Sequence, residues 1–193
     1  MSGELGKALA QKITRKMPRK KLEEHIARML KKVTMCTLVT SSGDIPRGTP
    51  LEYFSDWLTL YMSPDPGKKT KNLGVNPNVS ISIYNDVYPN WEKDWQTVWG
   101  LQITGRGELL SDGDPEYACG REVINFKSFY RALGIDGNIL SRKRKILKVT
   151  PGKIELLQFG LINKGFASRQ VWRGKDNMFV HEGEAEFTGI ERP

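Results

Sequence analysis

Apolar side chains recur at two different periods along the chain, and the change of period divides it. One series runs from Leu5 to Met17 at every fourth position, and a second runs from Leu22 to Val33 with helical spacing. Such spacing is typical of amphipathic helices that place one apolar stripe against a core. The sequence therefore predicts two N-terminal helices, with Pro18 in the first turn of the second.

From residue 34 onward, apolar residues alternate with polar ones, which is the period of a strand that buries one face. Residues 34–63 predict three short strands, with turns at residues 42–44 and 55–56. Residues 79–83, with three apolar side chains separated by serines, predict a further strand. These strands are short enough to pair as antiparallel neighbours.

Two later segments also have the composition of strands. Residues 98–111 predict a long strand, and Gly105 inside it indicates a bulge or a close backbone approach. Residues 146–159 predict a strand pair that turns at Pro151 and Gly152.

Shorter helices and loops are expected between and after the strands. A helix is predicted from Lys68 to the Asn76–Pro77 pair, and another from Asp114 to Gly134. Residues 85–97 are polar and predict a long loop.

This pattern predicts a β-rich α+β domain of about six antiparallel strands with N-terminal and peripheral helices. A small barrel is the economical closure, because it removes the exposed sheet edges. We expect residues 1–33 to form a basic helical segment packed on the barrel, residues 34–160 the barrel, and residues 161–193 a C-terminal extension.

Composition limits the class of protein. The 193 residues are 38% hydrophobic, which suits one folded domain, and no apolar run approaches the ~20 residues of a membrane span. The N-terminus has no apolar core of a signal peptide. Cys36 and Cys119 lie far apart in no motif, which favours two buried thiols in a reducing cytoplasm.

The net charge of +8 is concentrated at one end. Residues 1–32 contain ten Lys or Arg and three Glu, so the rest of the chain is almost neutral. A basic segment of this kind can contact nucleic acid. It is more often the solvated face of a helix, and nucleic acid is not an expected partner.

A cluster of lysines at the start of the third predicted helix is a candidate phosphate site. Gly67 precedes Lys68 and Lys69, and cations at a helix N-terminus oppose the helix dipole unless an anion lies there. Arg47, on an earlier strand, could donate to the same phosphate. A solvated lysine-rich loop is the alternative.

The stretch "IPRGTPLEYFSDWLTLYMSPDPGKKTKNLGVNPNVSISIYN", followed by "GLQITGRGELLSD", resembles the flavin-binding split-barrel family that includes the pyridoxamine 5'-phosphate oxidases. The resemblance covers about half of the chain. It implies a homodimer of six-stranded split barrels with FMN at the subunit interface. The FMN contacts that it implies are Arg47, Thr49, Pro50, Leu51, Tyr61, Met62, Ser63, Lys68, Lys69 and Gln102.

The sequence departs from this family at the substrate side. Glu52 stands where the vitamin B6 oxidases place a lysine for the substrate phosphate, and no C-terminal substrate motif aligns. Gly100 aligns with the family's ring-contacting glutamine, so Gln102 is a displaced candidate. The resemblance therefore implies an FMN-dependent oxidoreductase of a small unknown molecule rather than a vitamin B6 oxidase.

Two other functions stay open from the sequence: a flavin-binding protein without turnover, and a haem-binding protein that would use a ligand such as His181. His25 is expected on the surface. No catalytic acid–base pair and no metal-binding spacing is visible. Trp91, Trp95 and Trp99 could form an aromatic wall over a flavin, a dimer contact or a small separate core.

Overall fold

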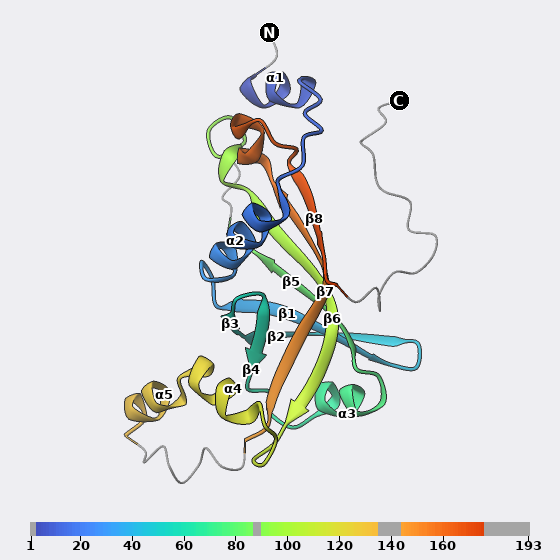
Figure 1. Cartoon of the computed structure of the whole chain (residues 1–193), viewed down its shortest axis with the longest axis vertical. Coiled ribbons are helices and arrows are strands. Elements are labelled where there is room, and N and C mark those ends of the chain that lie inside the picture. The colour runs from blue at the N-terminus through green and yellow to red at the C-terminus, as the bar shows by residue number, and fades with distance from the viewer. Residues whose placement is uncertain (1–2, 87–89, 135–143, 176–193) are drawn as a thin grey trace.

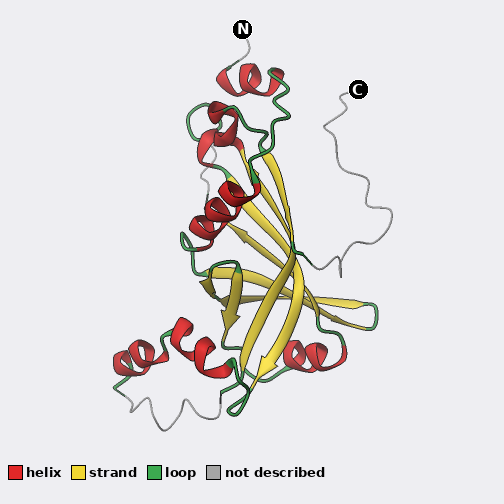
Figure 2. Cartoon of the chain, in the orientation of Figure 1, coloured by secondary structure: helices red, strands yellow, loops and turns green. Residues whose placement is uncertain are grey.

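Eight strands form one antiparallel sheet in the computed structural model, which describes residues 3–86, 90–134 and 144–175 (Figures 1 and 2). The strands are β1 Met35–Ser42, β2 Ile45–Glu52, β3 Phe54–Asp56, β4 Thr59–Met62, β5 Asn78–Tyr84, β6 Trp99–Leu110, β7 Ile146–Gln158 and β8 Arg169–Arg173.

The order of the strands requires the sheet to curl. The order is β2-β1-β5-β6-β7-β4-β3, with β8 paired to β7, so β2 and β3 stand at opposite ends. Tyr53 alone separates these two strands in the sequence, and its N–H donates to the Thr34 carbonyl at 2.8 Å. The two ends therefore meet, which confirms the predicted α+β split barrel, although the sheet has more strands than the six expected.

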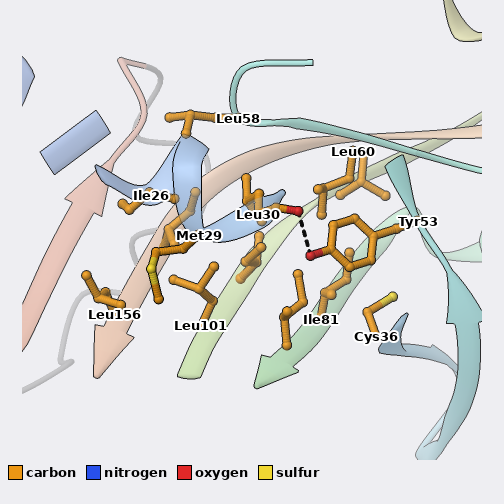
Figure 3. Close-up of a cluster of buried hydrophobic side chains, with 14 of the residues drawn as sticks. Ile26, Met29, Leu30, Cys36, Tyr53, Leu58, Leu60, Ile81, Leu101 and Leu156 are labelled. Atoms are coloured by element: carbon orange, nitrogen blue, oxygen red, sulfur yellow. Dashed lines mark hydrogen bonds between the residues drawn. The ribbon is translucent and has the colours of Figure 1, made fainter. Parts of the chain in front are cut away.

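The helix α2, Arg19–Leu30, packs on the barrel through its buried side chains. Its apolar face, which includes Ile26, Met29 and Leu30, packs on the side chains of β5, β6 and β7 in the main core (Figure 3). The Tyr53 hydroxyl donates to the Leu30 carbonyl at 2.9 Å, which ties the closure point of the sheet to the end of α2. Thus one residue joins β2, β3 and helix α2.

The two longest strands, β6 and β7, pair along their whole length and connect the two halves of the sheet (Figure 1). Thr104 pairs with Lys153 while Gly105 pairs with Pro151, so Gly152 is an extra residue in β7. This is a β-bulge, which bends the pair and increases its twist. The predicted turn at Pro151 and Gly152 is therefore wrong: the segment is one bent strand.

The first helix is shorter than predicted. Helix α1 spans Glu4–Ala10, and Lys12 adopts a left-handed conformation with φ of 45°. The following residues leave the helix, and Met17 reaches the main core from an extended segment. Tertiary packing has therefore overridden the four-residue period. No helix in the described ranges is long and apolar enough to span a membrane.

Two helices replace the single helix predicted between Asp114 and Gly134. Helix α4, Tyr117–Ile124, and helix α5, Phe126–Ala132, are separated by Asn125, whose left-handed φ of 53° ends the first one. Asn tolerates this conformation better than most residues. The helix begins after Glu116, because Asp114 instead closes the preceding turn by accepting the Ser111 N–H.

Three further details differ from the predictions. Residues 34–63 form four strands rather than three, because the chain breaks at Tyr53 between β2 and β3, and the second turn lies at Trp57 and Leu58 rather than at residues 55–56. The 3₁₀ helix η3, Phe159–Lys164, and strand β8 add regular structure after the barrel. These elements were not visible as a periodic pattern because they are short.

His25 on α2 is half-buried rather than on the surface as expected. Its Nε2 atom hydrogen-bonds Gln158 Oε1 at 2.7 Å. Burial lowers the pKa of His25, and the nearby cations Arg28, Lys164 and Lys32 lower this pKa further. The neutral imidazole is therefore favoured in the folded chain.

Replacement of Gly105 by alanine should destabilise the bend. A Cβ atom there would lie 2.6 Å from the Thr150 carbonyl oxygen, a backbone atom that cannot move aside freely. We expect urea unfolding of Gly105→Ala to show a loss of about 1–3 kcal/mol. In the control Gly100→Ala, on the same strand, the new Cβ would meet nothing closer than 3.7 Å and should cost little. Equal losses in the two variants would contradict the close approach.

The two cysteines should differ sharply in reactivity. Cys36 is buried, and burial raises the pKa of its thiol to about 12. Cys119 is exposed on α4, contrary to the predicted burial of both thiols. Because the thiolate is the reactive form, we expect a thiol reagent to modify one cysteine per native chain quickly and Cys119→Ser to abolish this fast phase. Two fast equivalents would show that Cys36 is accessible.

Candidate functional site

The lysine cluster lies on helix α3, Lys68–Val75, and a small residue on β6 lets this helix approach the sheet. Leu73 is the buried residue of α3, and a Cβ atom on Gly107 would lie 2.9 Å from its Cδ2 atom. The Gly107 N–H also donates to the Pro77 carbonyl just after the helix, at 2.8 Å. Gly107 therefore lets α3 pack closely on β6, and its N–H holds the residue that follows the helix.

Two asparagine side chains fix α3 on the β1–β2 hairpin, beside which it lies in Figure 1. Asn72 Nδ2 donates to Thr40 Oγ1 at 3.2 Å, and Asn76 Nδ2 donates to Ser41 Oγ at 3.1 Å. Thr40 is 1% exposed, so its hydrogen bond is made away from water. Because Asn72 and Asn76 are four residues apart, both reach the hairpin from one side of the helix.

The side chain of Thr70 forms hydrogen bonds with the backbone of Gly67 at the start of α3. The Thr70 hydroxyl accepts from the Gly67 N–H at 3.0 Å and donates to the Gly67 carbonyl at 2.9 Å. The first-turn N–H groups of a helix have no acceptor within it. Lys68 is exposed and Lys69 is partly exposed at this turn. The first turn of α3 therefore combines two cationic residues with N–H groups that have no acceptor within the helix, a combination that stabilises a bound anion.

Arg47 lies on the side of the hairpin that α3 approaches. It pairs across the ladder with Thr40, the acceptor of the Asn72 hydrogen bond. Residues paired across two strands project their side chains from the same face. The exposed Arg47 guanidinium is therefore on the same face as the contact that fixes α3.

Two hydroxyl groups at predicted flavin positions are buried without a partner. Thr49 Oγ1 and Ser63 Oγ have no hydrogen-bond partner among the described residues, although both atoms are inaccessible to solvent. Buried polar atoms are normally hydrogen-bonded. Thr49 shares the face of β2 with Arg47 and with Leu51, which packs against the main core. Each hydroxyl therefore has hydrogen-bonding capacity that the described residues do not use, at a position where the resemblance implies a flavin.

The side chains of Tyr61 and Met62 are packed within the protein. Met62 is fully buried in the main core, and Tyr61 is covered by α4 in a second apolar cluster. Burial and, to a smaller extent, the adjacent Cys119, whose Sγ atom lies 4.0 Å from the hydroxyl, raise the pKa of Tyr61 to about 12. A ligand beside β4 would therefore meet the backbone of these residues rather than their side chains.

Pro50 and Gln102 lie on the opposite face of the sheet from Arg47. Pro50 pairs with Thr37, Thr37 with Ser82, and Ser82 with Gln102. Each pair projects from one face, and along β2 the positions of Pro50 and Arg47 have opposite parity. Gln102 borders a surface depression of about 150 Å³ that Ser82 and Glu155 also line. One chain therefore does not bring all the predicted contacts together.

The three tryptophans do not form a common wall. Trp99 is in the main core, and Trp95 is in a small cluster with Ala8 and Ile162. Trp91 is 50% exposed. Their sequence proximity therefore reflects separate packing roles.

Some residues that build the site were not singled out in the sequence. Asn72, Thr40 and Gly107 place α3, and nothing in their spacing identifies them. Thr70 was detectable, since a threonine three residues after Gly67 is a capping pattern. No group of three or more His, Cys, Asp or Glu that could hold a metal ion occurs in the described part of the chain, and His181 lies outside it.

The structure is similar to three solved structures of low sequence identity. A candidate pyridoxamine 5'-phosphate oxidase from Listeria innocua matches with a TM-score of 0.52 and 22% identity, covering 70% of this chain and 98% of that chain. A FAD-binding protein from Mesorhizobium loti has a TM-score of 0.55 and 19% identity, with 69% and 91% covered. A heme-binding protein from Mycobacterium smegmatis has a TM-score of 0.57 and 14% identity, with 81% and 59% covered.

At these identities the similarity establishes the fold alone. A search of curated proteins finds no match. The family model described as pyridoxamine 5'-phosphate oxidase matches residues 22–158, which is well over half of the chain and includes strands β1 to β7 and helix α3. The chain belongs to the pyridoxamine 5'-phosphate oxidase family.

Proposed function

We propose that this protein binds FMN and acts as a flavin-dependent oxidoreductase on a small molecule. The observation that supports this proposal is the placement of Lys68 and Lys69 in the first turn of α3, with Arg47 on the face of the hairpin to which α3 is hydrogen-bonded. A phosphate ester carries close to two negative charges and is stabilised by such a group of donors. The terminal phosphate of FMN suits this cradle.

The remaining contacts would come from the β2 and β4 strands. Thr49 Oγ1 and Ser63 Oγ lack protein partners and would donate or accept hydrogen bonds from the flavin ring or ribityl chain. Leu51 would supply apolar contact beside them. FAD is the cofactor in the name of the Mesorhizobium loti structure, but a single phosphate matches this short cradle better.

We further propose that two copies of the chain share the flavin. Gln102 lies on the opposite sheet face from Arg47, so it would contact a flavin held by the partner copy rather than by its own chain. A homodimer with FMN at its interface would bring the Arg47 face of one copy and the Gln102 face of the other to the same flavin. It would also cover Tyr84 and Val171, which are 62% and 45% exposed.

Bound flavin would supply the chemistry of hydride or electron transfer. The residues of this chain would bind the phosphate, orient the ring and exclude water beside β4. Glu52 is exposed at the end of β2, and its negative charge would repel a substrate that carries a phosphate. We therefore propose a substrate other than a phosphorylated vitamin B6 compound.

Loss of the phosphate donors should weaken FMN binding selectively. We expect Arg47→Gln, and Lys68→Gln combined with Lys69→Gln, to raise the dissociation constant for FMN by about tenfold or more, since each removes charge-assisted hydrogen bonds. Quenching of flavin fluorescence measures this constant. Riboflavin, which lacks the phosphate, should bind the variants and the parent protein equally.

Lys127→Gln, on exposed α5, is the matched charge control and should leave FMN binding unchanged. Equal weakening of FMN and riboflavin would place the phosphate elsewhere. A purified protein with a haem Soret band and no affinity for FMN would overturn the proposal in favour of the haem alternative. Bound FMN that neither NADH nor NADPH reduces would favour a flavin-binding protein without turnover.

A further inference from the structure

A row of basic side chains follows one exposed side of helix α2. Lys21, His25, Arg28 and Lys32 are spaced by four, three and four residues, which aligns them along the helix. Lys21, Arg28 and Lys32 are exposed, and His25 is half-buried among them. From the sequence alone we expected only a solvated helix face here.

A cation from a distant part of the chain joins this row. The exposed Lys164 of η3 is close enough to lower the pKa of His25, as are Arg28 and Lys32. The hydrogen bond between His25 and Gln158, which directly precedes η3, holds the two segments together. We call Lys21, His25, Arg28, Lys32 and Lys164 the basic row.

Few carboxylates oppose the basic row. Glu23 and Glu24 are the acidic residues of α2, and Glu23 contacts Arg19 at 2.9 Å and Trp172 at 2.7 Å, on the β8 side. In the described ranges, no residue of the basic row takes part in the ion pairs of Arg19, Arg144, Lys148 and Lys153. The charge of the row is therefore not balanced by salt bridges of its own.

We propose that the basic row binds the phosphate backbone of double-stranded nucleic acid. The helix rises by roughly 10 Å from Lys21 to Arg28, which matches about three phosphates of one strand, and Lys32 follows two residues after the end of the helix. The contact would be independent of base sequence, because the helix is packed on the barrel and cannot enter a groove, and contacts to phosphates carry no sequence information. Lys21 Nζ lies over the Phe166 ring, 4.8 Å from its centroid, so this lysine would meet a phosphate beside that ring. This site is separate from the proposed flavin site on α3.

A membrane surface fits these observations less well. A helix that lies on a bilayer inserts its apolar face into the lipid. The apolar residues of α2 are already buried in the protein core: Leu22, Ile26, Ala27, Met29 and Leu30. The basic row therefore provides positive charge but no apolar side chains that could insert into lipid. Such a surface suits a polyanion in water better than a membrane.

The test is binding of the full chain to a labelled 20-base-pair DNA duplex of mixed sequence, measured by fluorescence anisotropy at several salt concentrations. With four cations engaged, the affinity should fall about a hundredfold between 50 and 200 mM salt. The combined variant K21Q/R28Q/K32Q/K164Q should weaken binding at least tenfold. The control K93Q/K127Q/R131Q/K145Q removes the same charge from exposed positions elsewhere and should change binding less than twofold.

A second readout locates the duplex. Phosphates beside Arg28, Lys32 and Lys164 would offset their positive field, so the pKa of His25, measured by NMR in the His181→Gln variant, should rise when DNA binds. Any one of three results would overturn the proposal: equal weakening in the two combined variants, an unchanged pKa of His25 in the bound state, or tighter binding to phosphatidylserine vesicles than to DNA.

Discussion

The pairing of β6 with β7 is the constraint on which the rest of the structure depends. These strands pair from Trp99–Gln158 to Leu110–Ile146. Strand β5 pairs with β6, β4 and β8 pair with β7, and the remaining strands follow through β5 and β4. Gly152 is the extra residue that bends the pair, and Gly105 opposite admits the Thr150 carbonyl. The bend lets β4 and β3 return to β2, where Tyr53 closes the barrel. Strand β6 also carries Gly107, which lies against Leu73 of α3. The strand pair therefore also positions the helix that carries the candidate phosphate site.

The two faces of this sheet have different roles. The inner face carries the main core, and at the hairpin end it carries Arg47 and Thr49. The outer face carries a row of polar residues in register across β1, β5, β6 and β7, namely Thr37, Ser82, Gln102 and Glu155. A ligand that uses both sets must lie between two copies of the sheet, which is why we propose a shared flavin. The strand register thus connects the proposed cofactor with the proposed dimer.

Much of the fold was predictable because its causes are local. Alternating residues identified β1, β5 and β6, and Gly67 with Lys68 marked the start of α3. The sequence predicted a turn at Pro151 and Gly152, because a Pro–Gly pair is common in turns and also fits a bulge. Only the pairing with β6 on both sides of Gly152 shows that the segment is one bent strand. The first helix ends earlier than predicted, and Met17 packs in the main core from outside a helix. The spacing of apolar residues in the sequence does not reveal this long-range contact. Asn125 divided a predicted helix through its own left-handed conformation.

The charged residues of the candidate site were predictable from the sequence, but the residues that hold α3 in place were not. Arg47, Lys68 and Lys69 are chemically conspicuous, whereas Asn72 acts only through Thr40, a contact between distant segments. Sequence also could not show that Gln102 and Arg47 lie on opposite faces, because this depends on the register of four strands. The mass of the FMN-loaded protein, measured by light scattering, tests the shared site most directly. The account predicts two chains with one FMN per chain; a monomer fully loaded with FMN would contradict it.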